Sequence, residues 1–487
     1  MSSHPKAAGT ADHPARRPED ARLPLPATLG YGMQHVLSMF GGVIAVPIII
    51  GGAAGLKGAD IAFLISCALF VSGLATVLQT LGVPYLGARL PLVQGISFAS
   101  VSTLVAIVGG HGQEGLRTAY GAIIVAGLIA FFIVPFFASI VRFFPPVVTG
   151  SIITVIGLSL LPVAGKWISG QPTFFVKGQV VANPAFGDPA SIALAMFTVL
   201  VVLILSKFRM FARMAILLSL VIGTLAALMT GQAKFSLANQ SIVALPQPFK
   251  FGMPIFAIGA IVSMLIVMLV IMVETTADIL AVAEVVGTDV PSKRVADGLR
   301  ADMLSSTVAP IFNSFSATAF AQNVGLVALS GIKSRFVVAA GGGMLMLFGL
   351  SPVLAAVVNV IPLPVLGGAG IALFGSVAAS GIRTLSKVSY DANNNLIIVA
   401  VSLSMGLLPS VVTNFWHQFP SWFSVVADSG ISACAVVAVL TNIWFNMLGA
   451  GRHEGSTLVS HSPARDIDHE RLGSLDQRED RPLSTTP

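Results

Sequence analysis

Apolar stretches of roughly 18 or more residues recur along nearly the whole of this 487-residue chain, and they constrain its fold more than any other feature. A run of that length with few charges is the signal for a helix that crosses a lipid bilayer. Only 10% of the residues are charged, whereas a soluble domain typically has about a quarter. The sequence therefore predicts an all-α polytopic membrane protein.

We expect fourteen spans within residues 27–450, between two polar tails, 1–26 and 451–487, that are predicted to be disordered and cytoplasmic. If both termini are cytoplasmic, the inside segments hold 21 of the 27 Lys and Arg residues, which is the asymmetry that the positive-inside rule requires. The basic residues thus sort by membrane side and do not indicate a nucleic-acid partner. The expected span starts lie near Ala27, Gly58, Pro91, Thr118, Pro146, Ser191, Met214, Pro254, Val295, Phe315, Phe336, Pro364, Leu396 and Ser429.

The third and tenth spans begin with polar, non-helical segments and leave room for only about three helical turns. They occupy the same position in two successive sets of seven spans. Interrupted spans in matching positions are typical of inverted-repeat transporters, whose substrate site lies between them. The alternative is that both are ordinary helices rich in small packing residues. These segments contain Gln94, Gly95 and Ser97 in the third span, and Asn313, Ser314, Ser316 and Thr318 in the tenth.

Two acidic residues of the eighth span, Glu274 and Asp278, are four residues apart and therefore lie on one face of a helix. Charges inside a membrane span are costly and usually functional. Two carboxylates this close disfavour the doubly charged state, so one of them is expected to hold a proton. The pair is suited to accept a substrate beside a proton site. The alternative is an internal salt bridge to a basic residue.

Two further polar groups are expected at membrane depth. Asp302, in the ninth span, lies near Arg300 and Asp297, and it is either structural or part of a proton relay. His35, in the first span, is either a packed core histidine or a residue that orients the site through a hydrogen bond.

Several other classes of function are excluded by what the sequence lacks. No metal-ligand spacing, phosphate-binding glycine loop or nucleophile–base constellation is present, so we expect neither a cofactor nor an enzyme. The two cysteines, Cys67 and Cys434, both lie in apolar runs and are interpreted as packing residues.

The segment "QNVGLVALSG", from Gln322 to Gly331, resembles the signature of the nucleobase–ascorbate transporters, also called nucleobase–cation symporters. Four other segments, "GMQHVLSMFGG", "ISFAS", "ETTADI" and "GLRAD", are similar to further landmarks of that family. The resemblance covers about residues 27–450 and is strongest to the bacterial xanthine and uric acid permeases.

This resemblance implies two inverted repeats of seven spans, divided into a core domain (spans 1–4 and 8–11) and a gate domain (spans 5–7 and 12–14). Spans 3 and 10 would contain short antiparallel strands followed by half-helices, with the substrate between them. Family members are multi-pass proteins of the cell membrane and are often homodimers.

The resemblance also assigns roles to residues. The main substrate carboxylate falls on Glu274, the purine-binding amide on Gln322 and the contacting aromatic ring on Phe98, while Asn323 shapes the site. Ser97 is a small residue that would leave room for the C8 oxygen of urate.

Asp278 and Asp302 match carboxyls that are important for proton coupling, and His35 is grouped with them. We therefore predict a proton-coupled symporter of urate or xanthine. The alternatives are a uracil or other nucleobase symporter, and an anion exchanger or channel of the same architecture.

Overall fold

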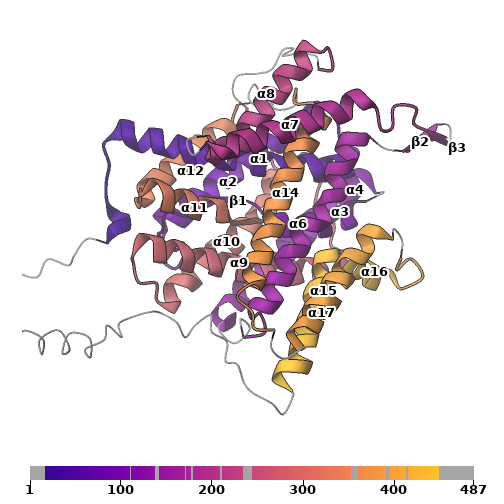
Figure 1. Ribbon diagram of the computed structural model, residues 1–487. Coiled ribbons are helices and arrows are strands. Elements are labelled where there is room, and N and C mark those ends of the chain that lie inside the picture. The colour runs from indigo at the N-terminus through magenta and orange to yellow at the C-terminus, as the bar shows by residue number, and fades with distance from the viewer. Residues whose placement is uncertain are drawn as a thin grey trace, which may run out of the picture.

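The computed structural model describes residues 17–109, 111–137, 142–170, 172–176, 179–208, 211–233, 244–351, 360–390, 394–412 and 415–448. Within them the chain is mainly helical (Figure 1). The helices are α1 (Leu25–Ala53), α2 (Ala59–Leu81), α3 (Val101–Val108), α4 (Gly112–Ile133), α6 (Pro146–Ser169), α7 (Pro189–Lys207), α8 (Ala215–Met229), α9 (Ile258–Val286), α10 (Ser292–Val308), α11 (Ala321–Ser330), α12 (Arg335–Gly349), α14 (Leu363–Leu385), α15 (Asn394–Val411), α16 (Ser421–Asp428) and α17 (Gly430–Asn442). The strands are β1 (Gln94–Ile96), β2 (Thr173–Val176), β3 (Gln179–Ala182) and β4 (Ala317–Ala319).

The lengths and composition of these helices agree with a multi-pass membrane protein. In the described part of the chain, nine helices are long and apolar enough to cross a membrane, and shorter apolar helices include α8 and α12. α4 begins at Gly112, well before the expected start of this span near Thr118. Its polar first turn contains Glu114, and an acidic residue there is favoured by the helix dipole.

The contacts between helices repeat after seven spans. The contact of α1 with α12 has its counterpart in the contact of α9 with α4. The contact of α2 with α12 has its counterpart in the contact of α10 with α4. Likewise α7 contacts α14 as α15 contacts α6, and α7 contacts α8 as α15 contacts α17. The central pair, α6 and α14, lies side by side in the middle of the molecule (Figure 1). This pairing is the pattern of a seven-plus-seven transporter fold.

Glycines allow two of these helix pairs to approach backbone to backbone. A Cβ atom on Gly73 of α2 would lie 2.5 Å from the carbonyl oxygen of Gly342 in α12. A Cβ atom on Gly157 of α6 would lie 2.6 Å from the carbonyl oxygen of Phe374 in α14. Such close packing through small residues is how helices associate where lipid removes most of the hydrophobic driving force.

The two short strands β1 and β4 lie within the third and tenth expected spans and pair with each other. The pairing is antiparallel, with Gln94 opposite Ala319 and Ile96 opposite Ala317. Backbone N–H and C=O groups without hydrogen bonds are costly at membrane depth, so two non-helical segments there must hydrogen-bond each other. Each strand is followed by a short helix: α3 after a 3-10 turn (Phe98–Ser100), and α11 directly.

A second pair of strands lies between α6 and α7. β2 pairs antiparallel with β3, with Thr173 opposite Ala182, and this hairpin projects from the edge of the molecule (Figure 1).

The predicted boundary of the N-terminal tail is wrong for residues 17–24. They contain a 3-10 turn (Pro18–Asp20), in which the Glu19 side chain is only 1% exposed and forms a 2.7 Å ion pair with Arg294. Asp20 forms a 2.6 Å ion pair with Arg335. Amino-acid composition predicts disorder here because it carries no information on tertiary contacts, and the segment is bound by two arginines that are distant in the sequence. The rest of the expected tails, residues 1–16 and 451–487, lies outside the described residues.

Candidate functional site

The centre of the candidate site is the place where β1 and β4 give way to their short helices. Phe320 precedes α11, and its amide donates a 3.1 Å hydrogen bond to the carbonyl of Val93. Its ring packs over Gly95 of β1, since a Cβ atom there would lie 2.0 Å from the ring. Phe98, which follows β1, has its ring centroid 6.2 Å from that of Phe320 and 6.0 Å from that of Phe374 in α14. Three aromatic rings thus meet at this junction.

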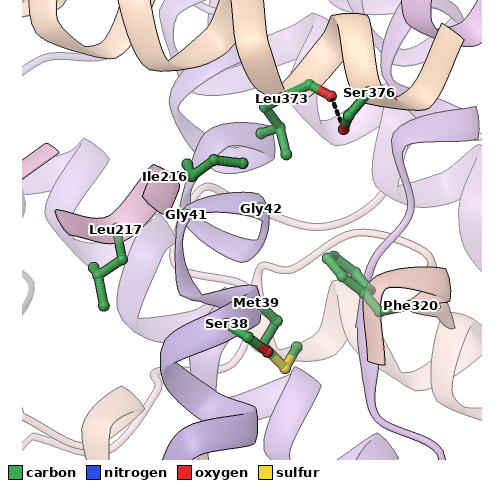
Figure 2. A pocket seen from close by; sticks show the side chains of 9 residues that line it. All are labelled: Ser38, Met39, Gly41, Gly42, Ile216, Leu217, Phe320, Leu373 and Ser376. Carbon is green, nitrogen blue, oxygen red and sulfur yellow. Dashed lines mark hydrogen bonds between the residues drawn. The ribbon is translucent and has the colours of Figure 1, made fainter. Parts of the chain in front are cut away.

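A small pocket opens beside Phe320 (Figure 2). Its walls come from α1, α8 and α14, so it lies between helices that are distant in the sequence. Most of the lining is apolar, and the polar groups are two serine hydroxyls, of which that of Ser376 donates to the Leu373 carbonyl at 2.7 Å. The lining residues are Ser38, Met39, Gly41, Gly42, Ile216, Leu217, Phe320, Leu373 and Ser376.

α9 carries both acidic residues of the predicted eighth span, one helical turn apart. Glu274 is partly buried and Asp278 is 7% exposed. One carboxyl oxygen of each, Oε2 of Glu274 and Oδ2 of Asp278, is buried without a hydrogen-bond partner among the described residues. The ion pairs found in the described part of the chain join other residues, so the alternative of an internal salt bridge is not observed. Buried acceptors left in this state are available to N–H donors of a ligand.

Asp302 of α10 is almost completely buried, with 1% exposure, and is held by neutral donors. The Thr275 hydroxyl of α9 donates to Asp302 Oδ2 at 2.6 Å, and the Gln79 amide of α2 donates to Oδ1 at 3.3 Å. Arg300 pairs instead with Asp297 at 2.7 Å. Asp302 is therefore linked to the helix that carries Glu274, and its charge is not neutralised by Arg300.

His35 and Asn323 contact each other, which brings α1 to the first turn of α11. The Asn323 side-chain amide donates a 3.0 Å hydrogen bond to the Pro91 carbonyl, so its oxygen faces His35 Nδ1. An amide oxygen can only accept, so Nδ1 carries the hydrogen. Of the two sequence-based interpretations of His35, this geometry supports the orienting one, because it braces the segment that leads into β1.

Two predicted site residues remain, Ser97 and Gln322, and the structure describes the side chain of Ser97 but not that of Gln322. Ser97 is fully buried directly after β1, its amide donates to the Ser316 carbonyl at 2.8 Å, and its Oγ has no partner among the described residues. Gln322 belongs to the first turn of α11 by its backbone, but its side chain lies outside the described residues. Its role stays a prediction.

Three residues of this region, Gln79, Thr275 and Phe320, were not singled out from the sequence. A signal for Gln79 exists, because Thr76, Gln79 and Thr80 are three and four residues apart and form a polar face on an apolar helix. Thr275 adjoins Glu274, but a hydroxyl beside an acid is too common to be informative. Phe320 precedes the amide pair, yet a phenylalanine in an apolar chain draws no attention.

Residues 26–415 match a family model described as "Permease family" (Xan_ur_permease). The chain belongs to this family. The predicted resemblance to the nucleobase–ascorbate transporters is thereby confirmed, and the protein is a permease rather than an enzyme.

The permease is similar to curated relatives over most of its length. The xanthine permease of Bacillus subtilis (strain 168) is 39% identical to it over 428 residues, which are 87% of this chain and 95% of the relative. The uric acid transporter UacT of Escherichia coli (strain K12) is 38% identical, over 85% of each chain.

Among solved structures, the transmembrane domain of the cyanobacterial bicarbonate transporter BicA superposes on the permease with a TM-score of 0.56. The match covers 86% of this chain and 97% of the other at 16% identity. A likeness at that level of identity concerns the fold alone.

Proposed function

We propose that this permease is a proton-coupled symporter that imports oxidised purines, urate or xanthine, across the cell membrane by alternating access. The observation that carries the proposal is the buried carboxyl oxygen of Glu274, which has no hydrogen-bond partner among the described residues, in a chain similar to permeases named for xanthine and uric acid. An aromatic cluster that includes Phe98 lies at the β1–β4 junction of the same fold.

The proposed roles follow from hydrogen-bonding chemistry. A xanthine-like ring has N–H donors beside carbonyl acceptors on one edge. Glu274 would accept from the N–H groups, and the Gln322 amide would donate to a carbonyl and accept from an N–H. Phe98 would contact the ring face. Each polar group of a purine left unpaired in a dry site costs about 1–3 kcal/mol, which is enough to select among nucleobases.

The proposed architecture has fourteen spans in two inverted repeats, with spans 1–4 and 8–11 as the core and spans 5–7 and 12–14 as the gate. The pocket beside Phe320 supports this division, because α1 on one wall belongs to the core and α8 and α14 on the others belong to the gate. Movement along that boundary would open and close the site. We further propose that both termini are cytoplasmic and that the permease is a homodimer.

For the proton, we propose a network of Asp278, Asp302 and His35 around the substrate carboxyl. Thr275, one residue after Glu274, hydrogen-bonds Asp302. A proton gained by the network would reduce the number of buried negative charges and so favour the movement of the loaded core. Proton and purine would then bind together and be released together.

The central test is the substitution Glu274→Gln, which keeps the size of the side chain and removes its charge. We expect it to abolish uptake of radiolabelled xanthine and urate into vesicles with an imposed proton gradient, because the purine N–H groups lose a charged acceptor. Gln322→Ala should have the same effect. The matched control is Glu284→Gln, an exposed residue on the same helix, which should transport like the wild type.

Three results would contradict the proposal. Wild-type uptake by Glu274→Gln, with normal amounts in the membrane, would exclude the site assignment. Strong competition by unlabelled uracil would favour the alternative nucleobase carrier. Uptake that survives collapse of the proton gradient would favour an exchanger or channel.

A further inference from the structure

Gln79 uses both ends of its side-chain amide inside the protein. It lies on α2 and is fully buried. Its Oε1 accepts a 3.2 Å hydrogen bond from the amide of Ala88, and its Nε2 donates to Asp302 Oδ1 at 3.3 Å. The side chain therefore bridges the loop after α2 and the buried acid of α10.

The bridge has a defined direction. A backbone N–H can only donate, so Ala88 fixes which side of the Gln79 amide carries the oxygen. The NH2 group must then face Asp302. A donor at this position matches an Asp302 Oδ1 that carries no proton. A proton on Oδ1 of a neutral Asp302 would weaken this hydrogen bond, because the hydroxyl oxygen of a carboxylic acid is a poorer acceptor than its carbonyl oxygen.

Thr275 differs from Gln79, because a hydroxyl can either donate or accept. It donates to Asp302 Oδ2 when the acid is charged, and it can accept from a protonated Oδ2 after rotating. Its oxygen also lies 3.4 Å from the Thr318 hydroxyl of β4, which can take the hydrogen that it then presents. Only Oδ2 has a partner that fits both protonation states.

We infer that Gln79 is a positioning residue that confines the exchangeable proton of Asp302 to Oδ2, the oxygen that faces α9, and stabilises the charged acid. This inference rests on the proposed function, in which Asp302 belongs to the proton network. It concerns a residue that neither the sequence patterns nor the family signature singled out.

The loop that fixes the Gln79 amide is itself anchored. Arg294 donates to the Ala88 carbonyl at 2.6 Å and to the Arg89 carbonyl at 2.8 Å. The Arg89 amide donates to the Gln79 backbone carbonyl at 2.9 Å. The position of the Ala88 amide, and with it the orientation of the Gln79 side chain, is thus set on two sides.

The acids on the neighbouring helix α9 give the Gln79 donor an electrostatic task, because like charges repel each other. Glu274 and Asp278 are the acids that lie on either side of Thr275 in α9, and Thr275 hydrogen-bonds Asp302. α2 and β4 present the neutral Gln79 and Thr318, while the charged residues of α4, Glu114 and Arg117, lie in its first turns. On α10 itself, Arg300 is bound to Asp297.

The test compares Gln79→Met with Gln79→Glu. The first keeps the approximate size but removes both hydrogen bonds, and the second keeps an acceptor for Ala88 but removes the donor to Asp302. The matched control is Thr80→Val. In the described part of the chain, this buried hydroxyl bonds within its own helix, at 2.7 Å to the Thr76 carbonyl and 3.3 Å to the Val77 carbonyl. All variants are purified at full length and reconstituted in vesicles.

Two readouts are needed. Infrared difference spectroscopy follows the carbonyl stretch of protonated carboxyls as a function of pH, with Asp302→Asn identifying the band of Asp302. Uptake of radiolabelled xanthine at varied external pH follows the proton dependence of transport. The infrared titration requires no substrate, so it decides the inference even if the permease proves not to carry purines.

Without the Gln79 donor, the charged acid is less stable and the proton binds more tightly. We therefore expect Gln79→Met to move both the infrared titration and the pH of half-maximal uptake to the alkaline side by about one pH unit, the effect of losing one hydrogen bond to a charged group. Gln79→Glu should shift them further in the same direction, and Thr80→Val should leave both unchanged. An unshifted titration of Asp302 in either folded Gln79 variant would overturn the inference and leave Gln79 with a packing role.

Discussion

Two neighbouring acids in the N-terminal segment offer a test of how burial sets the strength of an ion pair. Glu19 and Asp20 pair with Arg294 and Arg335 at nearly equal distances, 2.7 and 2.6 Å. The Glu19 side chain is 1% exposed, whereas that of Asp20 is 35% exposed. Glu19 also accepts a 3.3 Å hydrogen bond from Thr288. The distances therefore predict that the two ion pairs contribute equally to the free energy of unfolding, whereas the burial of the side chains predicts unequal contributions.

Substituting Glu19→Ala leaves the buried guanidinium of Arg294 with backbone carbonyls as its partners among the described residues. Removing one member of a buried pair typically costs about 3–5 kcal/mol, because the remaining charge has been desolvated without compensation. Asp20→Ala removes a pair that water already screens, and such pairs contribute about 0–1 kcal/mol. We expect a large loss of stability from the first substitution and almost none from the second.

The assay can use the two cysteines of the chain as reporters. Cys67 and Cys434 are both buried and free, so a thiol-reactive fluorophore labels the detergent-solubilised protein only as it unfolds. The temperature of half-maximal labelling should fall by many degrees for Glu19→Ala and by a degree or two for Asp20→Ala. A loss from Asp20→Ala as large as that from Glu19→Ala would refute the reasoning from burial.

Two further predictions concern the site itself. Gly95→Ala places a Cβ atom 2.0 Å from the Phe320 ring, which on its other side packs so closely on Gly42 of α1 that a Cβ atom there would lie 2.8 Å from it. We expect loss of uptake together with a lower unfolding temperature, whereas Gly343→Ala, which meets no atom within 4 Å, should do neither. Ser97→Asn fills the space next to Phe98, so it should reduce urate uptake more than xanthine uptake in a direct competition assay. Equal losses for both substrates would count against a role for Ser97 in selectivity.

Much of the architecture can be predicted from the sequence because its signals are local. A helix that crosses a membrane is encoded in its own consecutive apolar residues, so α1, α6 and α9 begin within a few residues of their expected positions. The interruption of the third and tenth spans is equally local, since Gln94–Gly95 and Asn313–Ser314 break an apolar run. Glu274 and Asp278 stand out because a charge within such a run is rare.

The partners of these residues could not be predicted, because a hydrogen bond is decided by what packing brings within about 3 Å. Nothing near Asp302 in the chain indicates Gln79, which is 223 residues away. The same holds for the contact of His35 with Asn323 and for the packing of the Phe320 ring on Gly95. Composition gave the wrong boundary for the N-terminal tail for this reason as well.

The sequence by itself determined that this protein is a helical, multi-pass membrane protein, and where acids and amides interrupt its apolar runs. These properties follow from the free energy of transferring each segment into lipid, which depends on that segment alone. The tertiary structure decided the register of β1 against β4, the anchoring of Glu19, and the orientation in which Gln79 meets Asp302. Those depend on helices from both halves of the chain packing together, because buried polar groups take their partners from whatever the packing brings close.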